Sequence, residues 1–170
     1  MALHLACAVK PAPPGLREPD GIATVAALLD AGAALEAAVP MDADEGDFRA
    51  TALWYAVARG ENAALVRFLL GRGADASSSL WAAVWRDDAV LLADLLRGGP
   101  RLNLRAHGET PIFYAARLRR LKTLDLLIWA GADPTIPDAR GRDALTIAKA
   151  RGLPAEMISR LAERTLRKSP

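Results

Sequence analysis

The chain has 170 residues, of which 52% are hydrophobic and 25% are charged. This composition allows a buried core and excludes an intrinsically disordered chain. The single cysteine excludes a disulfide framework and a cysteine-based zinc site. No apolar run reaches the roughly 18 residues that a membrane-spanning helix needs.

Charge is distributed unevenly along the chain. Residues 1–100 contain 8 Lys and Arg against 13 Asp and Glu, whereas residues 101–170 contain 14 against 7. The first part therefore carries a net charge of −5 and the second +7, which together give the +2 of the whole chain. We expect an acidic N-terminal end and a basic C-terminal end.

One sequence pattern recurs along the chain. It begins with a run such as Leu53–Ala56 or Ile112–Ala115, continues with an apolar stretch, and ends at Gly73–Asp75 or Gly131–Asp133. Equivalent runs begin at Leu3, Leu80 and Leu145. Successive starts lie 50, 27, 32 and 33 residues apart, so the base period is about 33 residues with one deletion and some insertions. The pattern predicts a single domain over 1–170 with repeats at 1–38, 47–76, 77–104, 105–137 and 138–167, and insertions at 10–20 and 39–47.

Each repeat has the pattern of two short helices. The first is rich in Ala, and we predict it over Ala52–Arg59 and Pro111–Leu118. The second carries apolar residues at helical spacing, as in residues 65–70. Because no strict alternation of apolar and polar residues occurs, the sequence predicts an all-α fold with turns.

Several residues predict where helices begin and end. Thr110 followed by Pro111 is typical of a helix start, and Gly73 and Gly131 are typical of a left-handed helix end. The last helix is predicted over residues 154–167, as a cap of the stack that is polar on one side. Its inward-facing residues are predicted to be Met157, Ile158, Leu161 and Leu166.

The segments Gly108–Ala116 and Leu126–Asp133 closely resemble an ankyrin repeat, whose pattern is G-x-T-P-L-H-x-A followed by L-L-x-x-G-A-D. The resemblance covers nearly the whole chain, as about five repeats. It implies an ankyrin-repeat solenoid of helix-turn-helix repeats with short hairpin fingers, acting as a non-catalytic module that binds a protein partner. The family's histidine is retained only as His4, and Ser77–Ser79 replace most of the third finger.

The resemblance also implies which residues face a partner. In ankyrin-like repeats the fifth and sixth residues after the leading Leu face the concave groove, and the finger tips also contact partners. The predicted groove residues are Arg59, Trp85, Arg86, Arg117, Leu118 and Arg151, and the predicted finger-tip residues are Phe48, Arg49, His107, Glu109, Arg140 and Arg142. Trp and Arg dominate binding hot spots, and Arg pairs well with carboxylates. We therefore expect a protein partner with an acidic surface.

Few residues suit catalysis or metal binding. Cys7 follows His4 by three residues, and we interpret the two as a buried thiol beside a structural histidine rather than a catalytic pair. An acidic run lacks the Gly and distant Glu of a calcium loop, and we interpret it as a solvated loop or a docking element for a basic partner; it comprises Asp42, Asp44, Glu45 and Asp47. The sequence predicts no catalytic residue, metal, cofactor or small-molecule substrate.

Two alternative functions remain open. Short ankyrin proteins rich in Ala and Arg resemble bacterial ones, some of which are similar to immunity proteins that neutralise a toxin by tight binding. The basic C-terminal part is also compatible with nucleic-acid binding, whose affinity falls steeply with salt. No basic region precedes Cys7 as a secretion signal requires, so we expect a cytoplasmic protein. The lone thiol also fits a reducing compartment.

Overall fold

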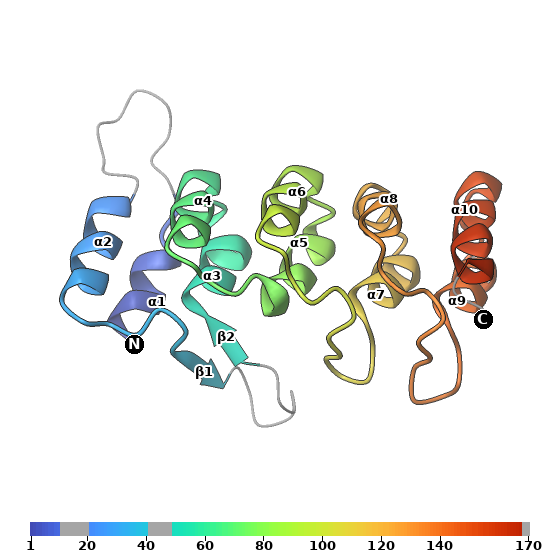
Figure 1. The fold of residues 1–170 in the computed structure, drawn as a ribbon, viewed down its shortest axis with the longest axis horizontal. Coiled ribbons are helices and arrows are strands. Elements are labelled where there is room, and N and C mark those ends of the chain that lie inside the picture. The colour runs from blue at the N-terminus through green and yellow to red at the C-terminus, as the bar shows by residue number, and fades with distance from the viewer. Residues whose placement is uncertain (11–20, 41–48, 168–170) are drawn as a thin grey trace. The chain divides into compact units, whose positions relative to one another are not determined.

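The computed structural model describes residues 1–10, 21–40 and 49–167. In this part of the chain five pairs of helices follow one another in sequence (Figure 1). The mostly helical, repetitive structure confirms the predicted fold class. The pairs are α1 (Ala2–Cys7) with α2 (Ile22–Asp30), α3 (Ala52–Tyr55) with α4 (Ala63–Gly71), α5 (Leu80–Arg86) with α6 (Ala89–Arg97), α7 (Pro111–Leu118) with α8 (Leu121–Ala130), and α9 (Ala144–Ala150) with α10 (Ala155–Leu166).

Contacts along the backbone divide the chain into two compact units. The N-terminal unit comprises Met1–Ala82 and Asp94–Pro100, and the C-terminal unit comprises Ala83–Ala93 and Arg101–Pro170. The boundary passes through α5 and α6. The division of one domain into five repeats stays a prediction.

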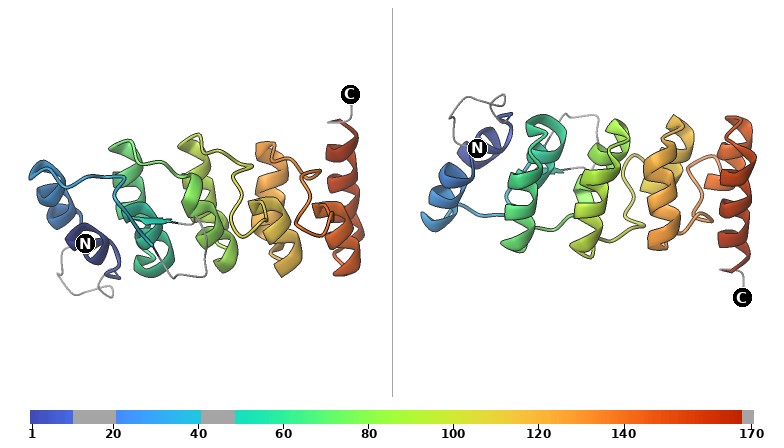
Figure 2. Two further views of the ribbon diagram at one scale, coloured as in Figure 1. Left: turned by 90° about the horizontal axis from the view of Figure 1, so that it is seen from below. Right: turned by 90° about the horizontal axis from the view of Figure 1, so that it is seen from above.

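Each unit buries apolar side chains between successive helix pairs. In the N-terminal unit α1 contacts both α2 and α3, and α2 contacts α4. In the C-terminal unit α7 contacts α8 and α9, and α8 contacts α10; these two pairs, orange and red, lie side by side in both views of Figure 2. Fully buried side chains include Leu53, Leu65 and Leu69 in the first unit and Phe113 and Leu124 in the second. A single pair could not enclose these residues, so each pair depends on its neighbour.

The predicted helix ends are confirmed. The Thr110 hydroxyl accepts a hydrogen bond from the amide of Phe113 at 3.4 Å, and Pro111 occupies the first turn of α7. Gly131 ends α8 with a φ of 96°, and Gly73 has a φ of 90° just after α4. Glycine suits both positions because residues with a Cβ rarely adopt this backbone conformation.

The first helix of the second pair differs from the prediction of one uniform helix over Ala52–Arg59. Four α-helical residues in α3 are followed by a π-helical segment, η1 (Ala56–Gly60). The residues are helical as predicted, but the wider turn is a feature that composition does not reveal. At the end of η1, Gly60 lies against the last residue of α1, and a Cβ on it would be 2.5 Å from the carbonyl oxygen of Cys7.

One of the predicted hairpin fingers contains a pair of short strands. Strands β1 (Ala38–Pro40) and β2 (Arg49–Thr51) pair antiparallel, with Ala38 opposite Thr51. Three-residue strands are too short for an alternating pattern to be recognised. In the third pair the short 3-10 helix η2 (Ser77–Ser79) precedes α5, whereas a finger precedes the first helix of the second, fourth and fifth pairs.

One residue of the last helix also differs from the prediction. Leu161 is fully buried, and Met157 and Ile158 are half-buried, but Leu166 is 74% exposed. Five residues separate Leu161 from Leu166, which places them about 140° apart around the helix. Leu166 therefore leaves the buried face of α10.

The turns between paired helices share a backbone conformation. Glu61, Asp87 and Arg119 have positive φ angles of 50°, 52° and 57°, and Gly152 has the same role in the last pair with 62°. A non-glycine residue in this conformation costs roughly 1 kcal/mol or more. The three side chains offset this cost by bonding to the neighbouring helix pair. Glu61 does so through an ion pair of 2.7 Å with Lys10.

A pair of glycine substitutions tests the packing of α1. Gly60→Ala places a methyl group against a backbone carbonyl, and we expect the free energy of unfolding to fall by about 1–3 kcal/mol. Gly71→Ala in α4 is the control, because nothing lies within 4 Å of its Cβ position; its stability should stay unchanged or rise by up to about 1 kcal/mol. Urea denaturation measures both, and equal stability of the two variants would contradict this packing.

Candidate functional site

The predicted partner-facing residues of the N-terminal unit are only partly described. Arg59 lies in η1 and is exposed. Arg49 is in β2, where its backbone pairs with that of Pro40. Phe48 and the acidic run at 42–47 lie outside the described residues.

In the C-terminal unit the end of α5 presents an exposed tryptophan. The Trp85 side chain is 58% exposed, and Arg86 beside it is exposed as well. The Arg120 guanidinium lies over the indole ring, 5.9 Å from its centre. This cation–π contact orients the ring while most of its surface stays in solvent.

Arg117, a predicted groove residue, is paired within the protein. Its Nε and Nη2 donate to Oε2 of Glu109 at 3.1 and 3.0 Å, and the guanidinium lies 5.1 Å from the centre of the Tyr114 ring. Both charged side chains are half-buried, as is Leu118. Two predicted partner contacts, Arg117 and Glu109, thus neutralise each other.

The fourth finger ends in a two-residue turn. Ala106 and Glu109 exchange backbone hydrogen bonds of 3.0 and 2.9 Å, and the two residues between them, His107 and Gly108, have φ angles of 51° and 73°. Such a turn matches the twist of paired strands. It places the exposed His107 side chain at the tip.

The fifth finger is organised by one carboxylate. Asp138 accepts hydrogen bonds from the amides of Arg140 and Arg142, each at 2.9 Å, and from Nε and Nη2 of Arg142 at 3.0 and 2.6 Å. The hydrogen bond from the Arg142 side chain is the main reason that the pKa of Asp138 is lowered from 3.8 to about 2. The Arg142 side chain is therefore paired with Asp138, whereas the Arg140 side chain is exposed.

Two basic residues that the sequence prediction left out join the predicted ones. Arg120 covers Trp85, and Arg119 donates from Nη1 to the backbone oxygen of Arg151 at 3.0 Å. Arg119 is the left-handed turn residue of its helix pair. The sequence feature that could have revealed these two residues is the basic run over residues 117–122, where the second helix of the pair begins.

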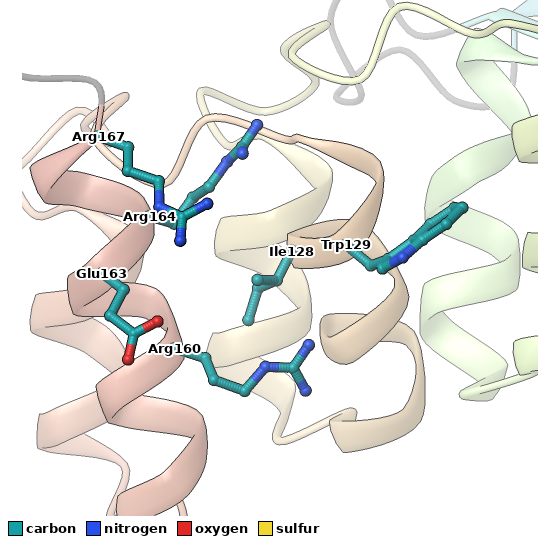
Figure 3. Close-up of a pocket in the computed structure, with 6 residues that line it drawn as sticks. All are labelled: Ile128, Trp129, Arg160, Glu163, Arg164 and Arg167. Atoms are coloured by element: carbon teal, nitrogen blue, oxygen red, sulfur yellow. The ribbon is translucent and has the colours of Figure 1, made fainter.

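A hollow of about 220 Å³ lies between α8 and α10 (Figure 3), lined by Ile128, Trp129, Arg160, Glu163, Arg164 and Arg167. Arg160 forms an ion pair with Asp125 of α8. The Arg164 guanidinium lies over Gly131, at the C-terminal end of α8, where a helix dipole favours positive charge. The Trp129 ring points away from α10 and is 79% exposed. The arginines around this hollow mainly join two helices.

The thiol and the imidazole near the N-terminus are structural, as predicted. Cys7 is fully buried, and burial raises its pKa from 9.0 to about 11, which leaves the thiol protonated near neutral pH. His4 donates from Nε2 to the backbone oxygen of Ala37 at 2.8 Å, and its ring packs edge-on against Tyr55. Among the residues that the structure describes, no group of three His, Cys, Asp or Glu side chains is suited to a metal ion.

Comparison with known families identifies the repeat. The family model for ankyrin repeats matches residues 20–138 of this chain in three copies. The chain belongs to the ankyrin repeat family. Ankyrin repeats are generally protein–protein interaction modules and are typically non-catalytic.

The match ends at residue 138, so α9 and α10 of this ankyrin repeat protein lie beyond it. No curated protein matches the chain. Over residues 1–10, 21–40 and 49–167, no helix combines the length and apolar character needed to cross a bilayer.

Titration of Asp138 tests the fifth finger. Because its pKa in the folded chain is below the ordinary value of 3.8, ionisation stabilises the fold, and this contribution is present above pH 3.8 and lost as pH falls through about 2. Carboxyl ¹³C NMR should give a midpoint near 2 that rises toward 3.8 in Arg142→Ala. Arg140→Ala is the control, since only its backbone bonds to Asp138. An unchanged midpoint in Arg142→Ala would refute this account.

Proposed function

We propose that this ankyrin repeat protein binds a protein partner without catalysing a reaction. In the C-terminal unit the contact surface comprises Trp85, Arg86, His107, Glu109, Arg117, Leu118, Arg140, Arg142 and Arg151. Phe48, Arg49 and Arg59 form a second set in the N-terminal unit. The exposed Trp85 ring is the observation that carries this proposal.

Trp85 has the properties of a binding anchor. An indole ring that stays 58% exposed leaves a large apolar surface in water, which burial against a partner would remove. The ring is oriented by Arg120 before any partner arrives. Binding therefore costs little side-chain entropy at this position.

Positive charge supports an acidic partner surface. Residues 101–170 have a net charge of +7. Arg140 and Arg151 are exposed, whereas Arg117 and Arg142 are paired with Glu109 and Asp138. We assign direct pairing with partner carboxylates to Arg140 and Arg151, and a positioning role to Arg117 and Arg142.

The proposal includes a reducing, cytoplasmic location. Its support is the single cysteine, which is a free thiol buried in the core of the N-terminal unit. Small proteins of oxidising compartments commonly depend on disulfides, whereas this one depends on apolar packing.

Substitution of the anchor tests the proposal. Partners are captured from a lysate of the source organism with the tagged full chain, identified, and then titrated in purified form. We expect Trp85→Ala or Arg86→Glu to weaken binding by roughly 2 kcal/mol or more, which is about thirtyfold. Circular dichroism should show unchanged helicity, because both side chains are exposed.

Trp129→Ala is the matched control for this test. Trp129 is the more exposed of the two tryptophans but lies on α8, outside the proposed contact surface. Its substitution should leave the partner's affinity unchanged. The proposal fails if Trp85→Ala and Arg86→Glu bind as tightly as the wild-type chain.

A further inference from the structure

Basic side chains gather at the turns between paired helices in the C-terminal unit. We call these residues the basic turn cluster: Arg119, Arg120, Lys122, Lys149 and Arg151. The first three lie where α7 gives way to α8, and the other two where α9 gives way to α10. All are exposed except the half-buried Arg120.

Three contacts bring successive turns of this unit together. Oδ1 of Asp87 accepts hydrogen bonds from the amide and the hydroxyl of Thr123, both at 3.0 Å. The Arg120 guanidinium lies over Trp85, and Arg119 donates to the backbone oxygen of Arg151. The turns that follow α5, α7 and α9 are therefore adjacent, and the basic turn cluster is one continuous surface bordered by Trp85.

The positive charge of this surface is not neutralised within the described residues. No ion pair joins any member of the basic turn cluster to a carboxylate in residues 1–10, 21–40 and 49–167. The two acidic residues that follow Arg86 in the sequence are used elsewhere. Asp87 binds Thr123, and Asp88 accepts from the amides of Val90 and Leu91 at the start of α6.

Such a surface does not stabilise the fold. Like charges close together raise the free energy of the compact state, and the paired arginines Arg117 and Arg142 show that this unit provides carboxylates where pairing is structural. The basic turn cluster has no such carboxylate among the described residues, so its charge is available to a ligand of opposite sign.

We propose that the basic turn cluster binds an acidic segment of a protein partner, through the carboxylates of Asp and Glu side chains. This inference rests on the proposed function, because it specifies the partner's chemistry and adds a second edge to the contact surface. Arginine donors suit bidentate pairing with carboxylates, and Trp85 at the border provides an apolar contact for the same segment. A protein segment is favoured over a nucleic acid because ankyrin repeats are generally protein–protein interaction modules.

Charge reversal in the full chain tests this assignment. The probe is a fluorescein-labelled peptide rich in Glu, titrated at low salt by fluorescence anisotropy, beside the same peptide with Gln in place of Glu. We expect the wild-type chain to bind the Glu peptide and not the Gln peptide. The double variant Lys122→Glu with Lys149→Glu should bind the Glu peptide about tenfold more weakly or worse.

A second double variant, Arg101→Glu with Arg167→Glu, is the matched control, because neither residue belongs to the proposed contact surface or to the basic turn cluster. It makes the same change in net charge at two exposed residues of the same unit, and it should bind the Glu peptide as the wild-type chain does. Equal losses in the two double variants would overturn the assignment, because attraction would then depend on net charge alone. Failure of the wild-type chain to bind the Glu peptide would overturn it as well.

Two further measurements separate this inference from its rivals. Tighter binding of a single-stranded thymidine oligonucleotide than of the Glu peptide would assign the surface to nucleic acid and overturn the proposal. If Trp85→Ala abolishes capture of the natural partner but Lys122→Glu with Lys149→Glu does not, the proposed function stands and the role of the basic turn cluster is wrong. Circular dichroism of each variant excludes unfolding as the cause of a loss.

Discussion

The constraint on which this structure depends is that no helix pair can bury its own apolar surface. Leu53 and Leu65 in one unit, and Phe113 and Leu124 in the other, are enclosed only because the next pair packs against them. Small residues in the first helices allow the close approach that this requires, and Gly60 against the carbonyl of Cys7 is the closest case. Stability is thus distributed over contacts between neighbours, as in other repeat proteins.

The same constraint explains the turns between paired helices. A tight turn that returns the chain to its own first helix requires a left-handed residue, and three of the four described turns use Glu, Asp or Arg where glycine would be less strained. Their side chains bond to the next pair or the previous one, so that the strain is offset by contacts between repeats. These contacts also fix the position of charged groups at the surface.

Several surface groups of the C-terminal unit are held in place by contacts with neighbouring side chains. Arg120 orients Trp85, Asp138 orders the fifth finger, and Glu109 binds Arg117. A surface organised in this way loses little entropy when a partner binds. The proposed functions use this property, since such a surface suits binding rather than covalent chemistry.

Much of the fold could be predicted from local sequence. The Thr110-Pro111 start of α7 and the glycine ends at Gly73 and Gly131 were readable because capping depends on residues within one turn of a helix. The π-helical segment η1 and the strands β1 and β2 were not readable, because packing against another segment decides them. Leu166 was misassigned because an apolar residue at a helix end need not lie on the buried face.

The sequence by itself determined the repeat period, the helix pairs, the family and the excess of positive charge toward the C-terminus. Only the tertiary structure decided which arginines are engaged and which face solvent. Arg117 reaches Glu109 eight residues away, and Arg119 reaches the backbone of Arg151 thirty-two residues away. The physical reason is that an ion pair or hydrogen bond acts over a few ångströms in space, whatever the separation along the chain.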